Sequence, residues 1–176
     1  MKRALVFAVV LVFAAGLCAA SYALPGLSLD AAVSVPFPTG DFGDAAKTGI
    51  GAGVDVFAGL PMLPFKIGGR VAYNRFAQKV GSGNTQIIEV LPSVRYELGL
   101  PLGVLRFFGQ VGAGLYSSMN DTKIPGLLDV KKTENKFGLA VGVGASAMSF
   151  MVMPMYHIMF DDNKTSYISL NVGMRF

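Results

Sequence analysis

Apolar residues recur at every second position through most of this chain. In one segment Phe137, Leu139, Val141 and Val143 alternate with small residues. This pattern indicates a β-strand, because successive side chains of a strand point to opposite faces. Residues 150–160 are apolar on both faces, so their period is ambiguous. The predicted strands are 28–38, 48–59, 65–76, 85–98, 104–116, 136–146, 150–160 and 165–176.

The lengths of these segments predict strands that cross a membrane. A tilted strand needs about 9–11 residues to span a bilayer, whereas most strands in soluble proteins have about 5–6. In lipid, an open sheet would leave backbone groups unpaired, so the strands must close on themselves. We therefore predict an all-β fold: a closed, antiparallel, up-and-down transmembrane β-barrel of eight strands.

Two other architectures stay open at this point. Residues 137–160 carry no charge, which is long enough for one membrane-spanning helix, although Gly142, Gly144 and Pro154 disfavour it. A soluble periplasmic sandwich would also alternate. The predicted connections favour the barrel, because three of the four odd-numbered ones are longer than the even-numbered ones, as in bacterial barrels with external loops and short periplasmic turns.

Residues 1–23 have the pattern of a secretory signal peptide. Lys2 and Arg3 are followed by an apolar run from Ala4 to Leu17, and Ser21-Tyr22-Ala23 supplies small residues at positions −3 and −1 of a cleavage site. We predict cleavage after Ala23, with cleavage after Ala20 as the alternative. Residues 24–176 then form one barrel domain. The only cysteine, Cys18, lies in the leader, which leaves no disulfide and no thiolate metal site in the exported chain.

Three segments carry a resemblance to a known family. They are the terminal strand Ser166–Arg175 followed by Phe176, the segment Val33–Phe42, and the segment Phe107–Tyr116. Together they resemble small bacterial outer-membrane β-barrels of the OmpW-like and OmpX-like kind, and the OmpA-type barrel domain. The resemblance implies a place in the bacterial outer membrane, in contact with its lipid and with lipopolysaccharide or an equivalent. The sequence leaves the oligomeric state open, and we favour a monomer. It also implies that Phe176 is part of the signal read by the barrel assembly machinery, with periplasmic chaperones as transient partners.

The predicted inward face carries many ionisable groups. Opposite charges there must pair, because an unpaired buried charge is costly. They form either a structural plug, which we favour, or an ion pathway. The residues are Asp30, Asp55, Lys66, Arg70, Glu89, Arg95, Glu97 and Arg106.

A second inward feature suggests a ligand site. Glycines on two strands face methionines on the next, and thioethers suit adaptable apolar surfaces. This wall predicts either an apolar slot that binds or passes small hydrophobic molecules, or close packing of methionines into space left by glycines. The candidate lumen residues are Gly112, Gly114, Gly142, Gly144, Met151, Met153, Met155 and His157.

Other segments and residues bear on the remaining function classes. The predicted external loop 117–135 favours a surface-exposed structural or adhesion protein as the alternative function. Enzymatic activity is not expected, because His157 is the only histidine and lacks the His-x-Ser pairing of barrel deacylases. A lone histidine also predicts no metal site, and we expect no cofactor. No basic run or basic–aromatic patch predicts nucleic-acid binding.

Overall fold

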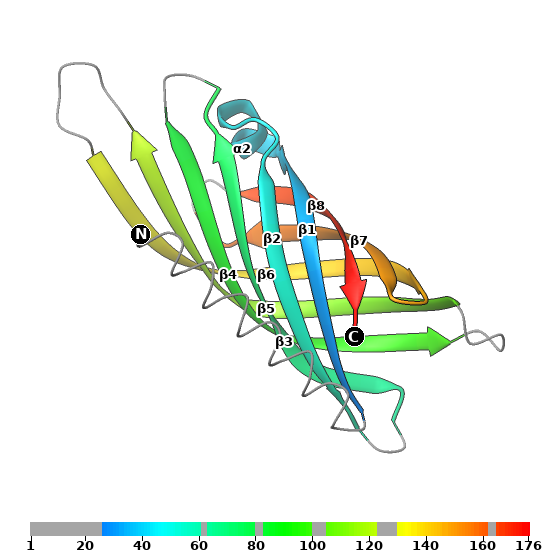
Figure 1. Cartoon of the computed structure of the whole chain (residues 1–176). Coiled ribbons are helices and arrows are strands. Elements are labelled where there is room, and N and C mark those ends of the chain that lie inside the picture. Colours follow the sequence, from blue (N-terminus) through cyan, green and yellow to red (C-terminus); the bar gives the residue numbers. More distant parts are fainter. Residues whose placement is uncertain (1–25, 61–62, 80–82, 100–104, 123–129, 162–164) are drawn as a thin grey trace, which may run out of the picture.

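A computed structural model describes residues 26–60, 63–79, 83–99, 105–122, 130–161 and 165–176. Eight strands follow one another around a closed barrel, and each is antiparallel to its neighbours (Figure 1). This confirms the predicted fold. The strands are β1 (Leu27–Thr39), β2 (Ile50–Gly59), β3 (Phe65–Ala77), β4 (Asn84–Gly99), β5 (Leu105–Thr122), β6 (Val130–Ala147), β7 (Phe150–Met159) and β8 (Ser166–Arg175).

The last strand closes the barrel on the first. β8 pairs with β1 from Asp30↔Arg175 to Thr39↔Ser166. Beyond this ladder, the Phe176 N–H donates to the Leu29 carbonyl at 2.8 Å, and the Leu29 N–H donates back at 3.1 Å. Closure pairs the backbone groups that lipid could not satisfy.

The two faces of the wall follow the predicted alternation. Val33, Val71, Val111 and Val143, each on a different strand, are exposed on the outside. The residues directly before and after each of them along its strand point inward. Aromatic rings lie on the outer face near both ends: Phe65 with Tyr96 at 5.3 Å between ring centroids, and Phe137 with Phe160 at 6.3 Å. An apolar band between two aromatic girdles is the outer surface of a membrane barrel.

Two prolines interrupt the ladders. The β4–β5 pairing skips from Val90↔Leu115 to Ser93↔Gly112, beside Pro92. The β6–β7 pairing skips in the same way beside Pro154. Proline has no N–H to give to a ladder, so the neighbouring strand loses its partner there. The side chains of both prolines face outward, which leaves the inward contacts intact.

The two ends of the barrel differ. One end, here called the terminal end, holds Gly26 and Phe176, and its β6–β7 turn is only Met148 and Ser149. The other, the loop end, holds the short helix α2 (Gly40–Ala45) and the tips of β5 and β6 (Figure 1). Helix α2 falls in a predicted connection; its Phe42 packs edge-on against Phe76 with ring centroids 5.0 Å apart. None of the helices in the described part of the chain is long and apolar enough to cross a membrane.

The predicted loop 117–135 is wrong over most of its length. β5 and β6 continue through seven further residue pairs, from Tyr116↔Lys136 to Thr122↔Val130. Only residues 123–129 of that loop lie outside the described residues. Beyond the apolar band both faces of a strand meet water, so no alternation marks its course. The predicted signal peptide 1–23, with Cys18, also lies outside the described residues.

Candidate functional site

The barrel interior holds the predicted charges in layers, the first near the terminal end. Arg95 donates to Asp30 and, through Nη2, to Gln110 Oε1 at 2.7 Å. Arg175 donates to the same Asp30 carboxylate at 2.8 and 3.0 Å. The Phe108 ring contacts both guanidinium groups, with its centroid 4.8 Å from Arg95 Cζ and 4.5 Å from Arg175 Cζ. The layer therefore combines ion pairs with cation–π contacts.

Lys66 and Glu97 extend this layer toward the terminal end. Their charged atoms are 3.0 Å apart, and Glu97 Oε1 lies 3.3 Å from Arg175 Nη1. Both side chains are partly exposed, whereas Asp30 and Arg95 are completely buried. The network therefore reaches water at its terminal end.

A second layer centres on Arg70. Its guanidinium donates to Glu89 at 2.9 Å, to Asp55 at 2.8 Å and to Asn171 at 2.6 Å. Gln110 Nε2 donates to the other Asp55 oxygen at 2.9 Å and joins this layer to the first. Each ion here is matched by an opposite charge and by hydrogen bonds, as buried charges require.

A third layer surrounds His157. Its Nδ1 lies 3.1 Å from Glu89 Oε2 and 3.1 Å from the Tyr116 hydroxyl, and its Nε2 lies 2.9 Å from Ser169 Oγ. The Tyr167 ring stacks on the imidazole at 4.3 Å, and its hydroxyl donates to Glu89 at 2.8 Å. These residues come from β4, β5, β7 and β8, so closure of the barrel brings them together.

The Ser169–His157–Glu89 arrangement has the partners of a nucleophile, a base and an orienting carboxylate. All three side chains are at most 1 % exposed, and in this structure they are joined in a buried network of hydrogen-bonding and ion-pair contacts. Among the described residues, no group of three or more His, Cys, Asp or Glu is placed to hold a metal ion.

The glycine–methionine wall is packed. A Cβ at Gly142 would lie 3.0 Å from Met155 Cε, and one at Gly144 would lie 2.4 Å from Phe108 Cζ. A Cβ at Gly112 would lie 2.5 Å from Ser93 Oγ. Opposing side chains thus occupy the space above these glycines, which favours the packing interpretation over the apolar slot.

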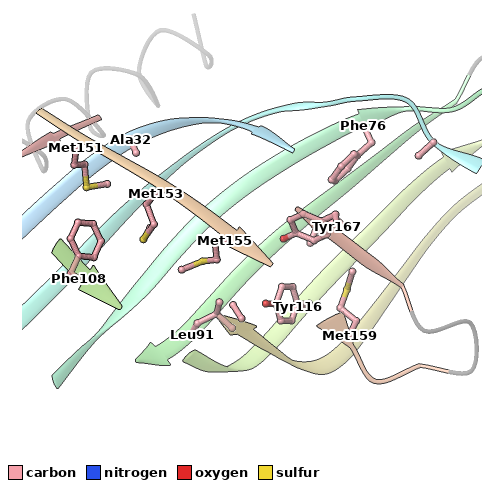
Figure 2. Close-up of a cluster of buried hydrophobic side chains, with 13 residues drawn as sticks. Ala32, Phe76, Leu91, Phe108, Tyr116, Met151, Met153, Met155, Met159 and Tyr167 are labelled. Carbon is pink, nitrogen blue, oxygen red and sulfur yellow. The ribbon is translucent and has the colours of Figure 1, made fainter. Parts of the chain in front are cut away.

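The methionines complete this packing. Met151, Met153, Met155 and Met159 all point into the barrel from β7 and are at most 2 % exposed (Figure 2). Side chains buried to this degree leave no water-filled space beside them. The methionine side chains of β7 therefore fill the space that the predicted apolar slot would need.

One predicted member of the charge network is misplaced. Arg106 is exposed at the end of β5, and no ion pair within the described residues includes it. At a strand end, an inward position opens to water, so alternation alone could not place it. Other members were missed although they occupy inward positions. These are Arg175, Gln110, Asn171, Tyr116, Tyr167 and Ser169.

The chain matches known proteins in sequence pattern and in fold. A family model described as an outer membrane protein beta-barrel domain matches residues 5–176. No curated protein sequence matches the chain.

Three solved structures are similar in fold at low sequence identity. Neisserial surface protein A has a TM-score of 0.61 at 16% identity, covering 85% of this chain and 96% of its own. Ail, the attachment invasion locus protein of Yersinia pestis, has a TM-score of 0.57 at 17% identity, covering 87% of this chain and 100% of its own. The N-terminal barrel domain of Pseudomonas aeruginosa OprF has a TM-score of 0.50 at 14% identity, covering 85% and 97%.

The fold, the apolar outer surface and the family model all indicate the same cellular location for this protein. The barrel lies in the bacterial outer membrane, and short turns of such barrels face the periplasm. The two-residue β6–β7 turn therefore puts the terminal end in the periplasm and the loop end outside the cell. The chain belongs to the outer membrane protein beta-barrel domain family.

Proposed function

We propose that this protein is a non-enzymatic surface-interaction protein that binds its partners through the external part of β6. The observation that carries the proposal is the part of the β5–β6 hairpin that projects past the Leu115↔Phe137 pair, where the apolar band ends. Seven residue pairs extend beyond that point, roughly 24 Å along the strands at about 3.4 Å per residue.

The interior argues against solute passage as the main function. Three layers of hydrogen-bonded ions and aromatic rings succeed one another, and the methionines fill the glycine wall. A water-filled path would have to break the Arg70 pairs, whose side chains are at most 1% exposed. Breaking buried ion pairs is strongly unfavourable. A closed lumen leaves the external surface as the part that can meet a partner.

Among the described residues, no strand pairs with the external part of β6 on the side away from β5. β7 pairs with β6 only from Gly138 onward. In the part of the chain that the structure describes, the last backbone hydrogen bond on this side of β6 is the Phe160 N–H donating to the Phe137 carbonyl at 2.8 Å, and beyond it the Lys136 side chain contacts Asp161. In an antiparallel strand, alternate residues direct both backbone groups to the same side. Thr133 and Asn135 therefore direct theirs to the edge on which no described strand lies. An extended peptide could add to this edge by strand pairing.

The test is attachment of bacteria displaying the full chain to cultured epithelial cells. A Thr133→Pro plus Asn135→Pro variant removes two edge N–H donors and keeps the pairing with β5, because the neighbouring residues make those bonds. We expect attachment to fall several-fold. The matched control, Thr133→Val plus Asn135→Val, keeps both donors and should attach normally.

Solute uptake into vesicles holding the refolded protein gives the second readout. We expect no uptake of matched hydrophobic or hydrophilic solutes above empty vesicles. Selective uptake of the hydrophobic solute by the folded barrel would restore the lumen hypothesis. Equal attachment by the proline variant and its control would overturn the surface function.

A further inference from the structure

A shallow apolar groove crosses the lipid-facing wall over β8, β1, β2 and β3, which lie side by side in Figure 1. Its volume is about 690 Å³, within the range of small-molecule binding sites. Its lining includes Ala31, Ala52, Tyr73 and Met174 on these strands, together with Ile88 on β4 and Phe176.

The sequence explains why a convex wall is hollow here. Ala31 and Ala52 are short side chains on the outer faces of β1 and β2, and both line the groove. Longer side chains lie beside them, because Met174 on β8 is opposite Ala31 and Tyr73 on β3 is opposite Ala52. Short side chains enclosed by long ones leave a depression that a flexible hydrocarbon chain can fill, gaining the contacts that an empty space forfeits.

Cations lie directly beyond the outer end of the groove. Arg75 follows Tyr73 on the same outward face of β3, and its side chain is exposed. The Lys47 N–H donates to the carbonyl of Ala77, the last residue of β3, and Lys79 follows two residues later; both lysine side chains are exposed. Within the described residues, no ion pair includes Lys47, Arg75 or Lys79.

Tyr73 marks the level at which headgroups begin. Its hydroxyl donates to Gln86 Oε1 at 3.0 Å, so a polar pair lies between the apolar groove and Arg75. Amphipathic aromatic residues take this position at a membrane interface. The apolar groove, the Tyr73–Gln86 pair and Arg75 thus follow one another toward the outside. An anionic lipid has its acyl chain, its interfacial region and its phosphate in the same order.

We propose that this groove is a specific site for an anionic phospholipid of the outer leaflet, one whose phosphate carries a net negative charge. One acyl chain lies over Ala31 and Ala52, and the phosphate is held by Arg75, with Lys47 and Lys79 adding positive charge. An uncharged lipid would fill the groove without the cation contacts, which are worth about a fivefold preference for each basic residue near a charged surface.

The chain contains no tryptophan, so one introduced indole reports its own surroundings. Tyr73→Trp places the reporter at the groove. Tyr156→Trp on β7 is the matched control, because Tyr73 and Tyr156 are 41% and 43% exposed on the outer face. Each refolded variant goes into phosphatidylcholine vesicles with increasing fractions of brominated phosphatidic acid, which quenches nearby indoles. We expect the Tyr73→Trp fluorescence to fall by half at a fraction of brominated lipid about fivefold lower than the fraction that halves the Tyr156→Trp fluorescence.

Further variants separate the two parts of the site. Ala52→Leu fills the groove and Arg75→Gln removes the cation; in the Tyr73→Trp background each should bring the two quenching curves together. Ala113→Leu, on the outer face of β5, should leave the difference unchanged. A heat-dependent gel shift verifies folding of every variant.

Three results would overturn the proposal. Equal quenching of both reporters means that the groove is ordinary lipid-facing wall. Equal preference with brominated phosphatidylcholine, whose phosphate is neutralised by its choline, means that the negative charge of the headgroup is not recognised. Shielding of the Tyr73→Trp indole from both lipids, with an Ala52→Cys variant forming disulfide-linked dimers, means that a second copy of this chain occupies the groove.

Discussion

At the scale of single residues, the interior is held by ions that cannot be removed one at a time. Arg70 balances Asp55 and Glu89, and none of the three reaches water. We expect Arg70→Met to lower the free energy of unfolding by about 3–5 kcal/mol, because it leaves two buried carboxylates without the arginine that pairs with both. Urea unfolding of the refolded barrel in lipid vesicles measures this. Arg106→Met removes an exposed arginine and should change the value by less than about 0.5 kcal/mol; similar losses from both would contradict the network.

Two glycines of β5 allow a second comparison at the same scale. A Cβ at Gly114 would lie 2.2 Å from the Val90 carbonyl oxygen, beside the break in the ladder at Pro92, whereas a Cβ at Gly109 meets nothing within 4 Å. Gly114→Ala should therefore destabilise the barrel by about 1–3 kcal/mol, the usual range for overpacking. Gly109→Ala should be nearly neutral. The same urea titration separates the two, and equal effects would mean that the strands separate freely at the proline.

Residue positions that depend on alternation could be read from the sequence, but partnerships could not. The period placed Asp55, Arg70 and Glu89 on the inner face, where they lie. It gave no sign that His157 would meet Glu89, which is remote in the chain and comes from a strand on the far side of the barrel. Such contacts depend on barrel closure and strand stagger, which side-chain period does not encode.

At the scale of elements, the alternation of apolar residues did not predict the external parts of β5 and β6. Within the membrane, lipid on one side and a packed interior on the other impose period two. Past Leu115 and Phe137 that difference disappears, and β5 and β6 run on through residues such as Ser117 and Asn135 without an apolar face. Helix α2 also lies in this external region. It has only six residues, and its Phe42 ring packs against Phe76.

The external hairpin is clasped to the β7–β8 connection by Asp161. Its carboxylate accepts from Lys136 Nζ at 2.6 Å, from the Thr165 N–H at 2.8 Å and from Thr165 Oγ1 at 2.6 Å. Burial acts to raise the pKa of Asp161, but the hydrogen bonds from Lys136 and Thr165 outweigh it and hold the pKa below its ordinary value.

A lowered pKa fixes the sign of the pH dependence. The clasp should contribute fully above the ordinary aspartate pKa of about 3.9 and be lost as pH falls through the lower folded-state value. The amide chemical shift of Thr165, followed by NMR from neutral to acidic pH, should titrate with a midpoint below about 3.9. In Asp161→Asn the step should vanish. A wild-type midpoint at or above the ordinary value would show that Lys136 and Thr165 do not hold the carboxylate.

At the scale of the whole molecule, the interior ion pairs depend on closure of the barrel. The ion pairs of Asp30 join strands that meet only in the closed barrel, because Asp30 on β1 binds both Arg95 on β4 and Arg175 on β8. Four cations and four carboxylates pair inside the described barrel, so the formal charges of these eight residues cancel. These eight residues are Lys66, Arg70, Arg95, Arg175, Asp30, Asp55, Glu89 and Glu97.

Phe176 separates the finished barrel from its route of assembly. Its backbone closes the ladder with Leu29, and substitution by alanine keeps both of those hydrogen bonds. If the terminal aromatic ring is the assembly signal that the family resemblance implies, Phe176→Ala should reduce the amount of folded barrel in cells several-fold. Refolding of the same variant into lipid vesicles should change little, since its half-buried ring is outside the interior network. A gel-shift assay of both preparations measures the two effects, and equal losses would mean that the ring stabilises the barrel itself.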